Sequence, residues 1–263
     1  MKVRLNYISG FEDAFTGMYT SKLVDPKTGE ARDLMKISQW HSYVCHNALN
    51  SDGSRVCIVP DVYDAETDEK NYETSKMIDE FNELLSKVVK IGKKHITLLR
   101  FINFSFTVTG IHRGAQDDID SHSKRLENKI LRGSTRLSDT SKIELSDFYK
   151  DKVLTLDQVL EQKGIELPDT YEYDGAIYKR VANGYVKEEY TKNKDVIRGL
   201  CMLGMESNFI MNVNLTEFAH IVKERDKNSG SNPEVKECIE KMIQLVENEY
   251  PEFNRDLYYE IRN

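Results

Sequence analysis

The feature that most constrains the fold is a change of hydrophobic period near residue 92. Between residues 73 and 91 apolar side chains recur every three or four positions, which is typical of one face of an amphipathic helix. Gly92 stands where a glycine that ends a helix is expected. From residue 96 to residue 109 the period becomes two, with Phe104 and Phe106 on one side, which predicts a long strand. The chain is therefore expected to pack helices against strands.

The remaining segments add to this mixed pattern. Strands are predicted at 2–8, 55–59 and 208–214, and helices at 33–47, 113–130, 155–163 and 193–203. The tyrosine-rich segment 165–193 is interpreted as an irregular excursion that could contain one helical piece. Asn214 and Glu217 have the spacing of a capping box at the start of another helix. Asn232 and Pro233 are the favoured first pair of a last helix that ends before Pro251. The predicted class is α+β.

Composition limits the functions open to this chain of 263 residues. No apolar run approaches the roughly 20 residues of a membrane-spanning helix. The net charge of -7 argues against general binding of nucleic acid. The four cysteines lie far apart, which favours reduced thiols over disulfides or a zinc site, so no metal is expected. Because the first residues alternate like a strand and lack the apolar core of a signal peptide, we expect a cytoplasmic protein.

A candidate anion site lies at residues 124–136. Gly133 lets the backbone approach a ligand closely, Ser134 offers a hydroxyl, and Arg132 and Arg136 supply forked donors that match phosphate. The alternative is that these cations leave a helix end, complement its dipole and stay solvated.

Several short motifs, taken in order, resemble the flavin-dependent thymidylate synthases, the ThyX family. They are Gly92 after a helix, Phe104-Ser105-Phe106, Ser134-Thr135-Arg136, Arg198, and Asn214 through His220 to Arg225. The resemblance covers roughly residues 73–136 and 192–250. It implies a single domain over 1–263, with an antiparallel sheet packed by long helices, a poorly matched region at 9–70 and an inserted segment at 138–192.

The resemblance implies two groups of site residues. In the nucleotide half, Ser134 and Arg136 would hold the phosphate, and Arg198 and Arg225 would bind the uridylate substrate. In the flavin half, the positions of the family's arginine-histidine-arginine triplet are Lys124, Arg125 and Leu126, and FAD would contact Lys124, Arg125, Asn214 and His220. The family's other flavin elements are replaced by residues 92–95 and 99–101, and one arginine by Thr216. His220 could equally be a packed core histidine.

Two hypotheses follow from this resemblance. The first is an FAD-dependent methyltransferase that converts dUMP to dTMP, or modifies a uridine nucleotide at C5 in a related way, with NADPH and methylenetetrahydrofolate as co-substrates. The second is a divergent nucleotide-binding protein that keeps the fold and has lost the FAD-dependent chemistry. Because two directional donors are replaced, FAD is expected to bind weakly. The family also implies a homotetramer with shared sites. No catalytic residue is assigned.

Overall fold

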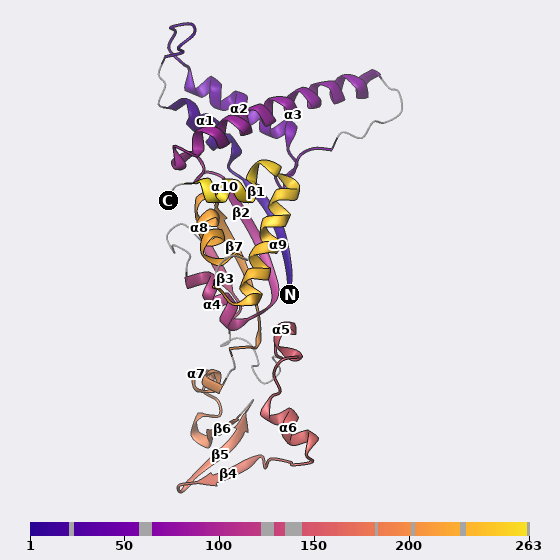
Figure 1. Ribbon diagram of the computed structural model, residues 1–263, viewed down its shortest axis with the longest axis vertical. Helices are drawn as coiled ribbons and strands as arrows, with labels where there is room; N and C mark the ends of the chain where they lie inside the picture. Colours follow the sequence, from indigo (N-terminus) through magenta and orange to yellow (C-terminus); the bar gives the residue numbers. More distant parts are fainter. Residues whose placement is uncertain are drawn as a thin grey trace.

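The computed structural model describes residues 1–20, 24–57, 65–121, 129–134, 144–181, 184–200, 203–226 and 230–261, with side chains except those of 65–69, 195 and 198. Within these residues no helix is long and apolar enough to cross a membrane. The molecule is elongated, with an upper layer of helices, a central sheet flanked by helices, and a lower extension (Figure 1).

The central sheet is antiparallel and has the strand order β1-β2-β7-β3. Its strands are β1 (Lys2–Ser9), β2 (Asn103–His112), β3 (Lys129–Arg132) and β7 (Glu206–Asn214). Alternate residues of β2 and β7, such as Phe104, Phe106, Met211 and Val213, are fully buried on one face. The period-two pattern thus fixes which face of the sheet meets the core. The mixed α and antiparallel β class predicted from the sequence is confirmed.

Helices cover the buried face of this sheet. They are α4 (Arg113–Ser121), α8 (Leu215–Arg225), α9 (Pro233–Glu249) and α10 (Arg255–Glu260). The predicted caps are confirmed: Asn214 accepts a hydrogen bond from the N–H of Glu217, and Asn232 accepts one from the N–H of Glu234 with Pro233 in the first turn. Each cap satisfies a backbone donor that the helix leaves unpaired, so these two helix starts are fixed locally.

The upper layer contains α1 (Phe11–Thr20), α2 (Leu34–Ala48) and α3 (Ala65–Gly92), followed by the short turn η1 (Ile96–Leu98). The sequence predicted α2 and α3 and missed α1. Gly92 is the last residue of α3 and does not have the positive φ expected of a terminal glycine. A Cβ there would lie 2.5 Å from Cγ and Cδ2 of Leu99. Gly92 is therefore required by close packing and not by backbone conformation.

The lower extension, here called the arm, consists of the described residues between 144 and 200 (Figure 1). It contains α5 (Asp147–Lys150), α6 (Leu156–Gln162), β4 (Thr170–Tyr173), β5 (Ala176–Val181), β6 (Gly184–Lys187), η3 (Glu188–Tyr190), α7 (Lys194–Ile197) and η4 (Arg198–Leu200). The strands form a three-stranded antiparallel sheet in the order β4-β5-β6. The expectation of an irregular excursion at 165–193 was therefore wrong.

Two other predicted elements differ from the structure. The strand expected from residue 96 begins at Asn103, because residues 96–98 form η1. The helix expected over 113–130 ends by Ser121, and Lys129–Arg132 forms β3, paired with β7 from Lys129 opposite Asn212 to Arg132 opposite Phe209. The backbone groups of β7 need a partner on that side, and this nonlocal requirement overrides the local helical pattern. Of the strand predicted at 55–59, Arg55 makes a single bridge with Leu49, and residues 58 and 59 lie outside the described part.

Candidate functional site

The predicted anion site begins where β3 ends. The N–H of Gly133 donates to the carbonyl of Asn208 at 2.9 Å, and its carbonyl accepts from Nη1 of Arg113 at 3.1 Å. Ser134 follows on the surface, exposed to solvent. These bonds tie the segment to the start of β7, so Ser134 is presented from an ordered strand end. Arg136 lies outside the described residues.

Arg132 belongs to the same strand end and has anionic partners within the chain. Its Nη1 lies 2.5 Å from Oδ1 of Asp117 and 3.4 Å from Oδ2 of Asp120, both on α4. Two carboxylates compensate the charge of this guanidinium. Arg132 would have to exchange these partners for a phosphate, which makes it the weakest member of the predicted nucleotide group.

Arg225, at the C-terminus of α8, is held differently. Its Nη1 donates to Oγ of Ser231 at 3.1 Å, while its Nε is buried and has no hydrogen-bond partner among the described residues. The next residue, Asp226, is fully buried and accepts from Arg255 at 2.7 Å and from the hydroxyl of Tyr259 at 2.6 Å. This network fixes the end of α8 against α10. Arg225 is thus positioned by its neighbours and keeps one buried donor for a ligand.

Of the two described candidates of the flavin half, Asn214 caps the start of α8 and His220 lies at the middle of that helix. Asn214 is 6% exposed, and its Oδ1 accepts from the N–H of Glu217 at 3.0 Å and from the hydroxyl of Thr216 at 2.7 Å. His220 is half-buried on the same helix. Asn214 therefore has a structural role as the helix cap besides any role toward a cofactor. Lys124 and Arg125, the other predicted flavin contacts, lie outside the described residues.

The described candidates come from separate parts of the chain. The backbone of Arg198 starts η4 in the arm, whereas Ser134 follows β3 and Arg225 ends α8. Asn214 precedes α8, whose 11 residues span about 16 Å at 1.5 Å per residue. A single phosphate group cannot contact both ends of α8. Asn214 and Arg225, which were predicted to contact the flavin and the nucleotide, lie at opposite ends of this helix, and His220 lies between them.

A pocket of about 730 Å³ lies between the ends of α1 and α3 and the η1 turn. The segments that replace the family's flavin elements line it with Lys94, His95 and Phe101, and Lys90 adds a further cation. Apolar side chains that include Met18 and Leu98 complete the wall. This combination suits an anionic ligand that carries an apolar ring. No sequence pattern predicted this pocket: Lys90 lies in the last turn of α3, whereas Lys94 lies in the turn that follows the helix.

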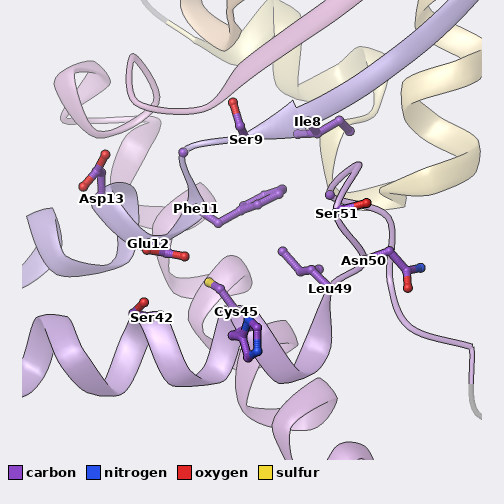
Figure 2. A pocket seen from close by; sticks show the side chains of 13 residues that line it. Ile8, Ser9, Phe11, Glu12, Asp13, Ser42, Cys45, Leu49, Asn50 and Ser51 are labelled. Carbon is purple, nitrogen blue, oxygen red and sulfur yellow. The ribbon is translucent and has the colours of Figure 1, made fainter.

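A second pocket, of about 540 Å³, lies between the start of α1, the end of β1 and the end of α2 (Figure 2). Phe11, Leu49 and Cys45 line it together with the carboxylates of Glu12 and Asp13. Burial, with a smaller contribution from the charge of Glu12, raises the pKa of the Cys45 thiol to about 12. The thiol is therefore protonated near neutral pH and is not a nucleophile. We assign this pocket no role in the reaction.

Comparisons with known proteins bear on this arrangement. A structure of thymidylate synthase X from Helicobacter pylori with FAD and dUMP is 12% identical, aligns over 98% of this chain and 99% of its own, and gives a TM-score of 0.51. A UMP/dUMP methylase, PolB, from Streptomyces cacaoi, bound with 5-Br dUMP, is 10% identical over 98% and 94% of the two chains, with a TM-score of 0.50. At these identities the likeness shows the fold alone. None of the curated protein sequences compared with the chain matches it.

The match to a protein family supports a stronger conclusion than the likeness to solved structures, which shows the fold alone. The family described as thymidylate synthase complementing protein matches residues 46–252. This range begins within α2, includes β2, β3, β7, α8 and α9, and ends in the turn η5 (Pro251–Phe253). It contains every residue that the sequence analysis assigned to the site, and it covers most of the chain. The chain therefore belongs to the thymidylate synthase complementing protein family.

Proposed function

We propose that this protein is a flavin-dependent thymidylate synthase-like enzyme that methylates dUMP, or a related uridine nucleotide, at C5. The observation that carries the proposal is the family match over residues 46–252, which includes the strand ends and both ends of α8. The bound dUMP, or its 5-bromo analogue, named for the two similar structures supports a pyrimidine nucleotide as the ligand class.

The nucleotide phosphate would be held by Ser134, Arg136, Arg198 and Arg225. Forked guanidiniums are the side chains best matched to a phosphate, and a buried Nε such as that of Arg225 gains the most from receiving a partner. Arg132 would contribute less, because Asp117 and Asp120 already compensate its charge.

FAD would contact Asn214, His220, Lys124 and Arg125, with NADPH and methylenetetrahydrofolate as co-substrates. When bound, the flavin supplies the electrons for reductive methylation. The pocket at the end of α3 supports a cofactor of this kind, because Lys90 and Lys94 provide positive charge beside the ring of Phe101. The protein's own contribution would be to orient the nucleotide and to hold its charge.

We further propose a homotetramer in which each site takes residues from more than one copy. The support is geometric: Asn214 and Arg225 lie at opposite ends of α8, and Arg198 lies in the arm. One copy alone would have to bring these distant positions to one site for the nucleotide and FAD together. A monomeric mass by light scattering at micromolar concentration would contradict shared sites. A cytoplasmic location stays a prediction from the N-terminal sequence.

Calorimetry with dUMP tests the nucleotide site. Arg136→Ala should lower affinity by about 1.5–3 kcal/mol, the scale of one charged hydrogen bond. Arg180→Ala is the matched control, since this exposed arginine pairs with Asp157 in the arm and should leave binding unchanged. Equal dUMP binding by the wild type and Arg136→Ala would remove Arg136 from the proposed site.

The alternative, a nucleotide-binding protein without FAD-dependent chemistry, is favoured by the loss of the arginine-histidine-arginine triplet at residues 124–126. An absorption spectrum discriminates between the two, because bound flavin absorbs visible light. Titration with FAD followed by a dUMP methylation assay completes the test. Nucleotide binding with no response to millimolar FAD would select the alternative.

A further inference from the structure

The arm contains little core of its own. None of its described residues belongs to the hydrophobic core cluster of the protein. The start of the arm is fixed to the rest of the molecule. The N–H of Ser146 donates to the carbonyl of Gly204 at 3.0 Å, and the ring of Tyr149 packs edge-on against the ring of His112. Farther along the arm, large apolar side chains are exposed, and their exposed fractions are Leu154 66%, Leu156 65%, Ile165 48%, Tyr171 53%, Tyr173 64% and Ile177 48%. A contiguous segment with such exposure is typical of a surface that binds another protein.

Within the arm, β4 is an edge strand whose four residues are all exposed. It forms a hairpin with β5 through Asp174 and Gly175, whose φ angles of 50° and 68° are those of a tight two-residue turn. The hairpin is therefore a preorganised element. An unpaired edge of this kind is a template for pairing with another strand.

The strand β4 carries negative charge without positive charge. Glu172 lies between two tyrosines, and Asp169 and Asp174 flank the strand. None of these three carboxylates makes an ion pair with any of the residues that the structure describes.

The central sheet has a complementary edge at β3. This strand, Lys-Ile-Leu-Arg, is also an edge strand and contains no carboxylate. Its Leu131 is 74% exposed and lies opposite Ile210, which is 48% exposed on the outer face of the sheet. Lys129 is also exposed, and it forms no ion pair with any residue that the structure describes. Apolar surface and positive charge thus coincide at β3.

We propose that β4 of one copy adds to β3 of a second copy and extends the central sheet across the contact. Tyr171 and Tyr173 share one face of β4 and would cover Leu131 and Ile210. Asp169 precedes Tyr171 by two residues and so shares that face, and it would lie near Lys129, which shares a face of β3 with Leu131. The second copy is the fitting occupant because one chain carries both edges, with matching length and opposite charge: each strand has four residues. Backbone pairing supplies the attraction, and side chains set the specificity. This inference does not depend on the proposed enzymatic activity.

Chemical cross-linking tests the contact on the full-length protein. Equal amounts of ¹⁵N-labelled and unlabelled protein are mixed, allowed to exchange subunits, and treated with a carbodiimide that joins amines to carboxylates. We expect a cross-link between the peptides that contain Lys129 and Asp169, with one labelled and one unlabelled partner. A cross-link confined to chains of one isotope after complete exchange, or no cross-link between these peptides, would overturn the proposal.

Charge reversal provides an independent readout. Lys129→Glu and Asp169→Lys should each weaken self-association about tenfold at low salt, and the double variant should restore it, because the two groups would lie within a Debye length of about 10 Å. Lys36→Glu on α2 and Glu161→Lys on α6 are matched controls at exposed positions. Unchanged association in both single variants would refute the contact. A tetramer that persists without the cross-link would leave the proposed assembly standing and reject this interface.

Discussion

Asn214 permits a test that separates a structural role from a cofactor role. Its Oδ1 accepts two hydrogen bonds, from the N–H of Glu217 at 3.0 Å and from the hydroxyl of Thr216 at 2.7 Å. Removal of an N-cap side chain costs about 0.5–2 kcal/mol, and the loss of two partners at a position that is 6% exposed points to the upper end. Asn214→Ala should therefore lower the free energy of unfolding by about 2 kcal/mol.

Asn214→Asp makes the comparison sharp. The carboxylate keeps the acceptor and is favourable at a helix N-terminus, so stability should stay within about 0.5 kcal/mol of the wild type. It loses the amide donor, so a flavin contact made by that donor would be weakened in both variants. Asn232→Ala removes the cap of α9 and is the control, since it should destabilise the fold without changing FAD affinity.

Urea unfolding at a fixed protein concentration measures stability, and fluorescence titration measures FAD affinity. Of the two Asn214 variants, only Asn214→Ala should be destabilised, with a fall in Tm of roughly 4–8 °C for about 2 kcal/mol in a protein of this size. An Asn214→Ala variant as stable as the wild type would refute the capping argument. Unchanged FAD affinity in both variants would remove Asn214 from the flavin site.

Three further predictions concern the upper layer. Gly92→Ala should lower the free energy of unfolding, measured in urea, by about 1–3 kcal/mol, because its Cβ would meet the buried Leu99. If the effects of Gly92→Ala and Leu99→Ala on the free energy of unfolding add in the double variant, this cause is wrong. Burial lowers the pKa of His41 from its usual 6.5, so the unfolded chain binds this proton more tightly. Stability should thus fall as the pH drops below about 6.5, and His41→Asn should flatten that slope in denaturation between pH 7 and 5. Mass spectrometry after thiol labelling should find the exposed Cys57 modified in the folded protein and Cys45 modified only after unfolding.

Elements with local signals could be predicted from the sequence. The starts of α8 and α9 follow from Asn214 and from Asn232 with Pro233, because capping depends on residues within one turn. The hairpin of the arm also had a local signal, since Asp174 and Gly175 are a favoured pair for a two-residue turn. The charge and irregular tyrosine spacing around it obscured that signal.

Elements set by distant partners could not be predicted in this way. β3 is a strand because it pairs with β7, which lies about 80 residues later in the chain, at Ile130 opposite Met211 and Leu131 opposite Ile210. Whether the charge of Arg132 is compensated likewise depends on a distant partner, because Asp117 lies on α4, which packs near the end of β3. A pattern of residue types predicts a cation at such a position. It does not show whether the charge is already compensated.

The geometry of α8 links the two halves of the proposed site. Its N-terminal end carries Asn214 as a cap, and its C-terminal end carries Arg225, held by the network of Asp226 with Arg255. Each end is fixed by contacts of its own, and about 16 Å of helix separates them. In the proposed homotetramer, the flavin end of one α8 would meet the nucleotide end of another, which would bring the two ligands within reacting distance. If sites are shared in this way, a change at either end of α8 should impair sites that more than one copy builds.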